Sequence, residues 1–270
     1  MARIVVGCAG WSYEDWIGIF YPRRLPKTDQ LAHYAKFFNF VEVNSTFYNM
    51  PAPETLAKWV EAVPDDFRFS IKIWNRISHS KRTPDIENRV TDFFSLLEVL
   101  EPKISCYLLQ FPPRLKFSSI AVNYVQELLH FIQEATNVPI VVEFRDNLWF
   151  TSDALEGIVD GKQCILGTSY KPEFAATYWP GQSRYYIRCV GDRQLTDFNR
   201  IQRQQEDVVN EVFAVVKEFE VTEGVHEVFV IFNNHFTGFS PQTANEFKHR
   251  LGLPTRQFPS QKTLIDFFKK

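Results

Sequence analysis

Eight short apolar runs rich in β-branched residues alternate along this chain with longer segments whose apolar residues recur at helical spacing. The runs cover residues 3–8, 40–43, 68–73, 105–109, 140–144, 164–168, 185–190 and 228–232. The helical pattern is clearest over residues 31–38, 56–60 and 121–132. Because strands that alternate with amphipathic helices build βα units, this pattern predicts a parallel sheet with helices packed on it.

The number of strands alone does not separate a closed barrel from an open doubly wound sheet. No G-x-G-x-x-G or P-loop glycine pattern follows the first run, so the sequence carries no nucleotide-cofactor motif. Polar residues stand instead at the carboxyl ends of most runs, where barrels build their sites. We therefore expect an α/β fold, a single (β/α)8 TIM-type barrel domain over residues 1–270. Its sixth and seventh strands should be joined by an irregular loop over 169–183, and residues 196–220 should form its longest helix. Prolines at 53 and 241 mark the starts of two further helices.

Charge and cysteine usage narrow the class of protein. The chain has 30 basic and 32 acidic residues, a formal net charge of −2 that does not favour a polyanionic partner. Its four cysteines lie in apolar segments without a C-x-x-C pair, which indicates reduced core thiols rather than a zinc or iron–sulfur site. No apolar run reaches 18 residues, and no secretion-signal segment follows Met1. We expect a cytoplasmic protein without a membrane partner, and its oligomeric state stays open.

Two of the apolar runs carry charged residues at their carboxyl ends. Glu42 and Asn44 lie two positions apart in VEVN, so in a strand they share one face while the two valines share the other. Glu143 and Arg145 repeat this arrangement in VVEFR. A strand covered on both faces is normally apolar throughout, so these polar faces must meet water, partner side chains or a ligand.

In a barrel the carboxyl ends of all strands converge on one pocket. The candidates for catalysis are the two strand carboxylates and the lysine of the third strand, Glu42, Glu143 and Lys72. The candidates for ligand binding, which are polar or aromatic residues at or just after strand ends, are Trp11, Tyr13, Asn44, Tyr48, His79, Gln110, Arg145, Trp149, Arg188, Asn233 and Asn234. This mixture of acids, cations, amides and aromatic rings suits a polar small molecule.

The roles of the three catalytic candidates have alternatives. Glu42 and Glu143 can act as acid and base or share a divalent metal, and the alternative is that both form ion pairs inside the barrel with Lys72, Arg145 or Arg188. No H-x-H or H-E-x-x-H spacing supports a metal, so the metal stays unknown. Burial of Lys72 would suit it to Schiff-base or general-base chemistry. We favour a counter-ion for Glu42, because a lysine among carboxylates keeps its charge.

Three further features bear on a ligand. An anion site is predicted after strands seven and eight, with plain turn formation as the alternative, from the cluster of Arg188, Gly191, Asn233, Asn234 and Gly238. His79 and His235 lie in loops, where each can contact a phosphate or a metal or simply be solvated. Loop aromatics such as Phe47 and Tyr48 can stack on a sugar or an unpaired base, although most such rings pack.

Several longer motifs resemble one known family. They recur from the first strand to the eighth and read GCAGWSYEDWIGIFYP, VEVNSTFYNMPAPETLAKW, FRFSIKIWNRISHS, LLQFPP, VVEFRDNLWF and VFVIFNNHFTG. These segments resemble the DUF72 family, which is similar to the YecE proteins. The resemblance implies a TIM-type barrel and a pocket, and the family has no established activity.

Two hypotheses of function follow. The first is an enzyme that acts on a polar or anionic ligand bearing a sugar or phosphate, bound at the carboxyl ends of the strands. The second is a nucleic-acid-binding protein, with metal-dependent phosphodiester cleavage as one form of it, and it rests on the aromatic loops and the basic clusters at 23–27 and 81–82. A pocket that only senses a ligand for a partner protein is a third alternative.

Overall fold

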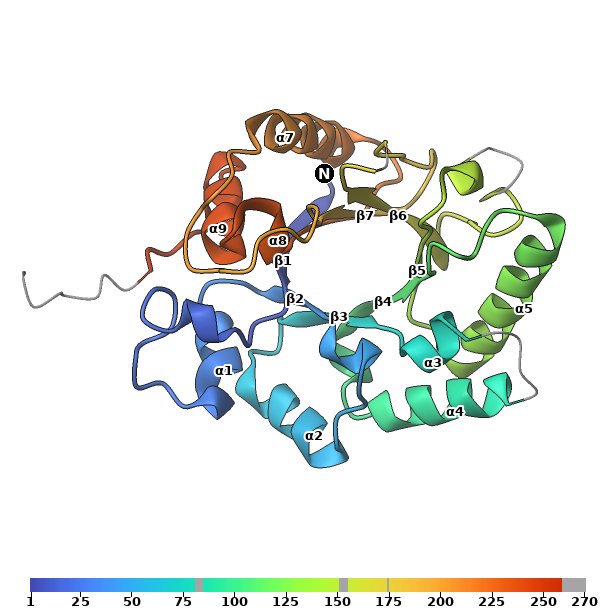
Figure 1. Ribbon diagram of the computed structural model, residues 1–270, viewed down its shortest axis with the longest axis horizontal. Coiled ribbons are helices and arrows are strands. Elements are labelled where there is room, and N and C mark those ends of the chain that lie inside the picture. Colours follow the sequence, from blue (N-terminus) through green and yellow to red (C-terminus); the bar gives the residue numbers. More distant parts are fainter. Residues whose placement is uncertain (81–84, 151–154, 174, 259–270) are drawn as a thin grey trace, which may run out of the picture.

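The computed structural model describes residues 1–80, 85–150, 155–173 and 175–258. Eight parallel strands close into a barrel in the order in which they occur along the chain, and helices surround it (Figure 1). The strands are β1 (Arg3–Ala9), β2 (Phe40–Val43), β3 (Arg68–Lys72), β4 (Ile104–Gln110), β5 (Ile140–Glu143), β6 (Cys164–Tyr170), β7 (Arg184–Cys189) and β8 (Glu227–Phe232). The predicted (β/α)8 barrel is therefore confirmed, because β1 pairs with β8 as well as with β2.

The helices follow the strands as βα units require. The α-helices are α1 (Gln30–Tyr34), α2 (Pro53–Ala62), α3 (Asn75–Ser78), α4 (Ile86–Leu97), α5 (Ser119–Ala135), α7 (Glu206–Val221), α8 (Asn234–Thr237) and α9 (Ser240–Arg250). Short 3-10 helices cover Glu14–Trp16, Lys27–Asp29, Ser45–Phe47, Glu101–Lys103 and Asn147–Phe150. The helix starts predicted from prolines 53 and 241 are found in α2 and α9. No helix among the described residues is long and apolar enough to cross a membrane.

The segment expected as the longest helix is a helix only in its second part. Residues 196–205 form a loop, and α7 begins at Glu206 with two acidic residues in its first turn, which favour a helix start there. The loop has other hydrogen-bond partners, since the backbone amide of Phe198 donates to Asp15 and that of Gln202 donates to the carbonyl of Thr237. The irregular connection between β6 and β7 is confirmed, and its described residues contain no helix.

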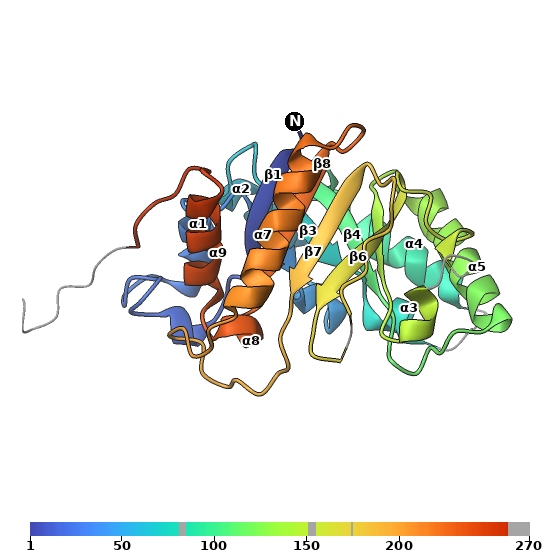
Figure 2. The same ribbon diagram turned by 90° about the horizontal axis from the view of Figure 1, so that it is seen from above.

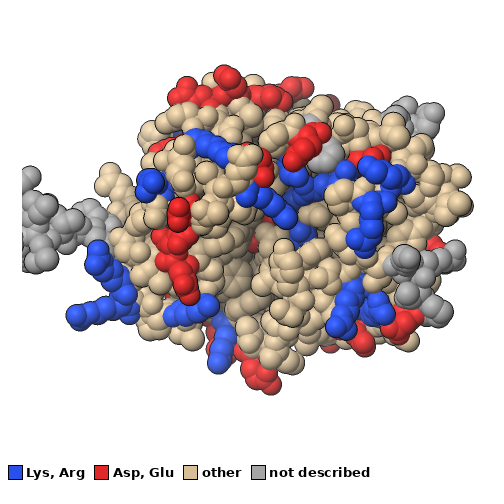
Figure 3. Space-filling model, in the orientation of Figure 1, with Lys and Arg blue, Asp and Glu red and all other residues tan. Residues whose placement is uncertain are grey.

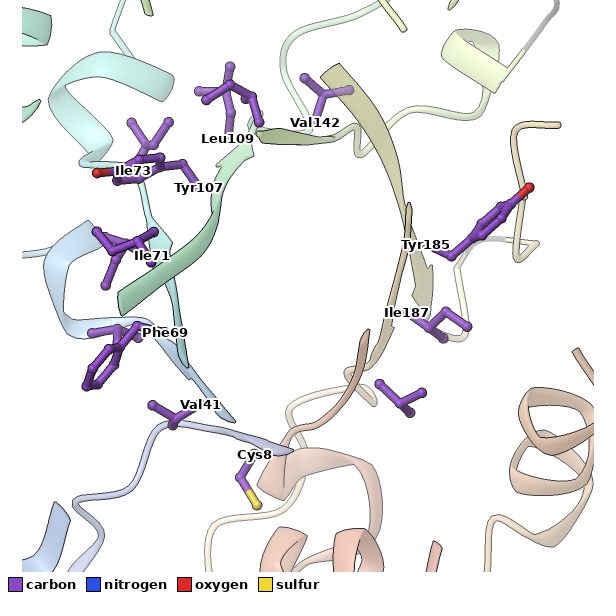
Figure 4. Close-up of a cluster of buried hydrophobic side chains, with 14 of the residues drawn as sticks. Cys8, Val41, Phe69, Ile71, Ile73, Tyr107, Leu109, Val142, Tyr185 and Ile187 are labelled. Carbon is purple, nitrogen blue, oxygen red and sulfur yellow. The ribbon is translucent and has the colours of Figure 1, made fainter. Parts of the chain in front are cut away.

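Two apolar layers hold the barrel together. Side chains that alternate outward along the strands, such as Val41, Ile71 and Ile187, pack against the surrounding helices (Figure 4). Inward side chains from other positions, such as Phe40, Ile165 and Phe229, fill the interior. Several inward positions nearer the carboxyl ends are charged, among them Glu42, Glu143 and Arg188, so the packed core gives way to a charged layer at one end.

The carboxyl ends of the strands share one face of the molecule. In Figure 2 the arrowheads of β6 and β7 point to the side on which α3 and α8 lie. This face looks toward the reader in Figures 1 and 3, and Lys and Arg side chains gather at its centre, over the barrel opening (Figure 3). The charged layer therefore lies at the end of the barrel where sites are built.

Candidate functional site

Arg188, near the end of β7, joins the two strand carboxylates inside the barrel. Its Nε and Nη2 donate to Oε2 and Oε1 of Glu42 over 2.7 and 2.8 Å, a bidentate pair. Its Nη1 donates to Oε2 of Glu143. All three side chains are buried. The structure thus shows the ion-paired arrangement for Glu42 and Glu143, with one guanidinium between them.

Neutral side chains also donate hydrogen bonds to both carboxylates. The Asn44 amide donates to Oε1 of Glu42 over 2.9 Å, and the Tyr186 hydroxyl lies 2.9 Å from Oε2. The Ser169 hydroxyl donates to Oε2 of Glu143 over 2.7 Å. Each of these residues projects inward from a strand or its end, as the period-two alternation requires.

The pKa values of both carboxyl groups are lowered despite their burial. Burial by itself raises the pKa of Glu143, but the charges of Arg145 and Arg188 outweigh burial and lower it to about 2. Burial likewise opposes ionisation of Glu42, and Arg188 with its hydrogen bonds reverses the effect, so this pKa is also lowered. Both carboxyl groups are therefore ionised at neutral pH and cannot donate protons there.

Lys72 is the last residue of β3, and its contacts differ from those expected of a counter-ion for Glu42. Its Nζ donates to Oε1 of Gln110 over 2.8 Å and lies 4.2 Å from the centroid of the Phe47 ring. Within the described part of the chain, no carboxylate lies at ion-pair distance from it. Burial and the nearby charge of Arg188 lower the pKa of Lys72 to about 7, although Glu143 and Glu42 act in the opposite direction. The expectation that Lys72 keeps its charge as a partner of Glu42 is corrected, because Arg188 occupies that position.

Arg145 and His79 complete the cationic side of the site. Arg145 pairs with Glu143 and donates to Gln110 Oε1 over 3.2 Å, so this amide oxygen accepts from both Arg145 and Lys72. His79 has its Nδ1 2.9 Å from the Ser78 hydroxyl. Burial, followed by the charges of Lys72 and neighbouring arginines, lowers the pKa of His79 to about 4, so its imidazole is neutral at pH 7.

A pocket of about 480 Å³ opens above these groups. It is lined by Phe47, Tyr48, Lys72, His79, Gln110, Pro113, Arg145, Lys171, Glu173, Asp192 and Arg193. Five of these, namely Lys72, Tyr48, His79, Gln110 and Arg145, belong to the residues expected from strand ends. Glu42, Glu143 and Arg188 are not lining residues, so they lie beside or beneath the pocket wall and act on it through charge and positioning.

The predicted aromatic ligand contacts lie elsewhere, apart from Tyr48. Trp149 is fully buried, stacks on Phe144 with ring centroids 4.2 Å apart, and donates its indole N–H to the Leu115 carbonyl. Trp11 packs edge-on against Trp59. The hydroxyl of Tyr13 donates a hydrogen bond to the carbonyl of Ala9, the last residue of β1. These three side chains support the strand-end loops rather than line the pocket.

The asparagines after β8 hold turns. The side chain of Asn233 accepts from the amide of His235 and caps α8, and Asn234 accepts from both the amide and the hydroxyl of Ser240. Gly238 ends α8 with a φ of 107°. The predicted anion site after strands seven and eight thus has the turn-forming arrangement in its eighth-strand part, and Arg188 is engaged with the carboxylates.

The sequence alone did not predict Pro113 or the four charged lining residues from the loops after β6 and β7. The four charged residues are Lys171, Glu173, Asp192 and Arg193. Among the described residues other than glycine, Arg193 alone has a positive φ, 64°. A non-glycine residue in this conformation is often held there at a functional site. Their position directly after two strand ends was the signal available in the sequence.

The donor set does not fit a divalent metal. Both strand carboxylates already accept hydrogen bonds from guanidinium groups. In the parts of the chain that the structure describes, no group of three or more His, Cys, Asp or Glu side chains is placed to hold a metal ion. Of the basic clusters behind the nucleic-acid hypothesis, Lys81 and Arg82 lie outside the described residues. Arg23 and Arg24 are exposed in the loop after β1 and do not line the pocket.

Fold and pocket together define a (β/α)8 barrel protein with a charged pocket at the carboxyl ends of its strands. The chain belongs to the family described as "Protein of unknown function DUF72", which matches residues 5–265. This confirms the resemblance found in the motifs.

Two curated relatives of this family are similar to parts of the chain. The UPF0759 protein YecE of Escherichia coli K12 is 38% identical over 109 residues, which are 40% of this chain and 38% of YecE. The UPF0759 protein YunF of Bacillus subtilis is 29% identical over 154 residues, which are 55% of this chain and 52% of YunF. The matched part thus spans about half or less of either relative.

Solved structures extend the likeness to the whole fold. A DUF72 family protein from Thermotoga maritima superposes with a TM-score of 0.75 at 24% identity and covers 93% of this chain and 99% of its own. One from Enterococcus faecalis has a TM-score of 0.71 at 21% identity, with coverages of 94% and 99%. At these identities the likeness shows the fold alone.

Proposed function

We propose that this protein binds a small anionic ligand, of the size of a phosphorylated or carboxylated sugar, in the pocket at the carboxyl ends of its strands, and acts on it there. The observation that carries the proposal is a surplus of positive charge in the pocket wall. Arg145, Lys171 and Arg193 line it as cations, joined by Lys72 when its amine is protonated, against two carboxylates, Glu173 and Asp192. A ligand anion would neutralise this surplus.

The charged layer beneath the pocket reduces this surplus by one charge without removing it. Glu42 and Glu143 are the buried carboxylates there, and Arg188 pairs with both while Arg145 pairs with Glu143. Wall and layer together hold five cations, with Lys72 protonated, against four carboxylates. The lining carboxylates are engaged as well, since Asp192 pairs with Arg203 over 2.7 Å and Glu173 with Lys171 over 3.1 Å.

Burial and the positive charge around the pocket lower the pKa values of two titratable groups in its wall. The pKa of Lys72 and that of His79 are both lowered, first by burial and then by neighbouring cations. Cations crowded together in a partly buried wall are destabilising unless an anion joins them. Both shifts are in the direction that a bound anion would reverse.

Size and surface chemistry suit a sugar-sized ligand. A volume of about 480 Å³ lies within the usual range for small-molecule pockets. The Tyr48 side chain, which is exposed in the pocket wall, offers an aromatic ring against which an apolar sugar face packs. Glu173 and Asp192 have further carboxylate lone pairs that accept hydrogen bonds from hydroxyl groups.

The proposal is tested by calorimetric titration of the wild-type protein with inorganic phosphate and then with a panel of sugar phosphates and sugar acids. Arg193→Gln and Lys171→Gln should each weaken phosphate binding by roughly three- to tenfold, since a charge-assisted contact at a partly exposed site contributes about 1 kcal/mol. The matched control is Arg184→Gln, which removes a cation at the opposite end of β7. Absence of phosphate binding to the wild type at millimolar concentration, or equal weakening by Arg184→Gln, would refute the proposed anion site.

A further inference from the structure

Lys72 combines features that no other described lysine combines. It lies at the end of a strand, it is 6% exposed, and it lines the pocket. Its hydrogen bond goes to a neutral amide oxygen on the neighbouring strand, and a phenyl ring covers one side. Lys171, the other lysine of the pocket, pairs with Glu173. Lys248 is the best comparison, since it is also partly buried, but it lies outside this pocket and donates to the Phe37 carbonyl.

These surroundings favour the neutral amine. An ammonium group gains stability from carboxylate contacts, and the carboxylates nearest to Lys72 are bound by guanidinium groups instead. At pH 8, about nine-tenths of an amine with a pKa of about 7 is neutral, whereas an ordinary lysine amine with a pKa near 10.4 is less than about one-hundredth neutral. A neutral amine on a rigid strand end is a competent nucleophile.

We propose that Lys72 is a covalent nucleophile that forms an imine with an aldehyde or ketone group of the anionic ligand. The inference rests on the proposed function, because it deepens the ligand class to small carbonyl compounds that carry a phosphate or carboxylate. The lysine is held by a strand end and by Gln110, while the cations of the pocket wall are placed to hold the ligand's anionic group.

The chemistry is balanced without any further reagent. The nitrogen lone pair of Lys72 attacks the carbonyl carbon, the C=O π bond breaks, and a proton moves from nitrogen to oxygen to give a carbinolamine. The C–O bond of the carbinolamine then breaks and a C=N bond forms. The hydroxyl group leaves as water together with the proton that the nitrogen gives up. His79 is suited to relay these protons, because it lines the same pocket and its imidazole is neutral at pH 7. A protonated imine attracts electrons and so weakens bonds at the adjacent carbon.

The test is reductive trapping on the wild-type protein at pH 8. The protein is incubated with glyceraldehyde 3-phosphate and sodium cyanoborohydride, digested, and mapped by mass spectrometry for the reduced adduct at each lysine. The uncharged partner compound is glyceraldehyde at the same concentration. Lys248 is the control residue in the same molecule, and Lys72→Arg, which keeps a cation but has no amine, is the control variant. Phosphate binding is measured on the same preparations by calorimetry.

We expect the phosphate ester to label Lys72 at least about tenfold more than Lys248, and more than glyceraldehyde labels it. We also expect inorganic phosphate to suppress the labelling and Lys72→Arg to abolish it at this position. If phosphate binds but Lys72 is labelled no more than Lys248, the nucleophile assignment is overturned and the anion site stands. If Lys72 reacts equally with both compounds and phosphate does not bind, the proposed anionic ligand class is overturned instead.

Discussion

Replacement of Arg188 by glutamine should destabilise the protein far more than replacement of Arg184 on the same strand. Arg188 donates to both buried carboxylates, so Arg188→Gln leaves two anions in the barrel interior with one fewer cation. The lowering of the Glu143 pKa from 4.5 to about 2 is equivalent to roughly 3 kcal/mol of preference for its charged form. Arg188 supplies part of this and is the largest cause of the lowered pKa of Glu42.

We therefore expect Arg188→Gln to lower the free energy of unfolding by about 3–5 kcal/mol at pH 7, as is usual when one partner of a buried ion pair is removed. Arg184 pairs with Glu227 over 3.0 Å at the other end of the barrel, and its side chain is 30% exposed. A pair that is open to solvent contributes about 0–1 kcal/mol, so Arg184→Gln should cost no more than that. Urea unfolding followed by circular dichroism measures both differences.

The pH dependence of the stability loss in Arg188→Gln tests whether the unpaired carboxylates cause it. Without Arg188, burial is no longer outweighed at Glu42, so its folded-state pKa rises above the ordinary value near 4.5. A buried carboxyl with a raised pKa destabilises the fold at neutral pH, and the penalty disappears as pH falls toward the ordinary pKa. The deficit of Arg188→Gln should therefore shrink between pH 7 and about pH 5. Three results would refute this reasoning: a loss of unfolding free energy below about 1 kcal/mol, a loss equal to that of Arg184→Gln, or a loss that grows on acidification.

Three further predictions concern the pocket, the thiols and the aromatic support. Sulfate does not titrate near neutrality, and it should bind more weakly as pH rises above about 7. The loss of affinity should approach tenfold per pH unit, because the bound anion favours protonated Lys72. In Lys72→Met the sulfate affinity, measured by calorimetry, should change little with pH across this range. The cysteines are all buried and free, and burial raises the pKa of each thiol, so a thiol-specific dye should react with the native protein negligibly at pH 8 and with all four after unfolding in urea. Trp149→Ala should cost about 3–5 kcal/mol of unfolding free energy and leave the intrinsic phosphate affinity of the folded fraction unchanged. Tyr48→Ala, at a residue that is 60% exposed in the pocket wall, should instead change stability by less than about 0.5 kcal/mol and weaken sugar-phosphate binding.

The fold was largely predictable because its signals are local. Glu42 and Glu143 were expected on inward faces from the period of two in their strands, and both project into the barrel. The start of α7 was missed, since the apolar period continues upstream into residues 196–205, whose backbone bonds are made to other loops. Periodicity describes one segment at a time and does not register such partners.

The candidate site was predictable in its location and less so in its membership. Lys72, Gln110 and Arg145 line the pocket because inward residues at strand ends converge whatever their identity. Trp149 has the same kind of position in the sequence, yet it turns back onto Phe144, where stacking buries both rings. Arg193 reaches the pocket through a loop whose backbone geometry has no periodic signature.

The sequence by itself determined the alternation of strands and helices, the inward face of each strand and the end of the barrel at which polar groups collect. These follow from side-chain periodicity, which acts over neighbouring residues. Only the tertiary structure decided that Arg188 pairs with Glu42, 146 positions away, and so leaves Lys72 without a carboxylate partner. Such choices depend on which strands barrel closure brings face to face, and the charge states of the buried groups follow from those distances.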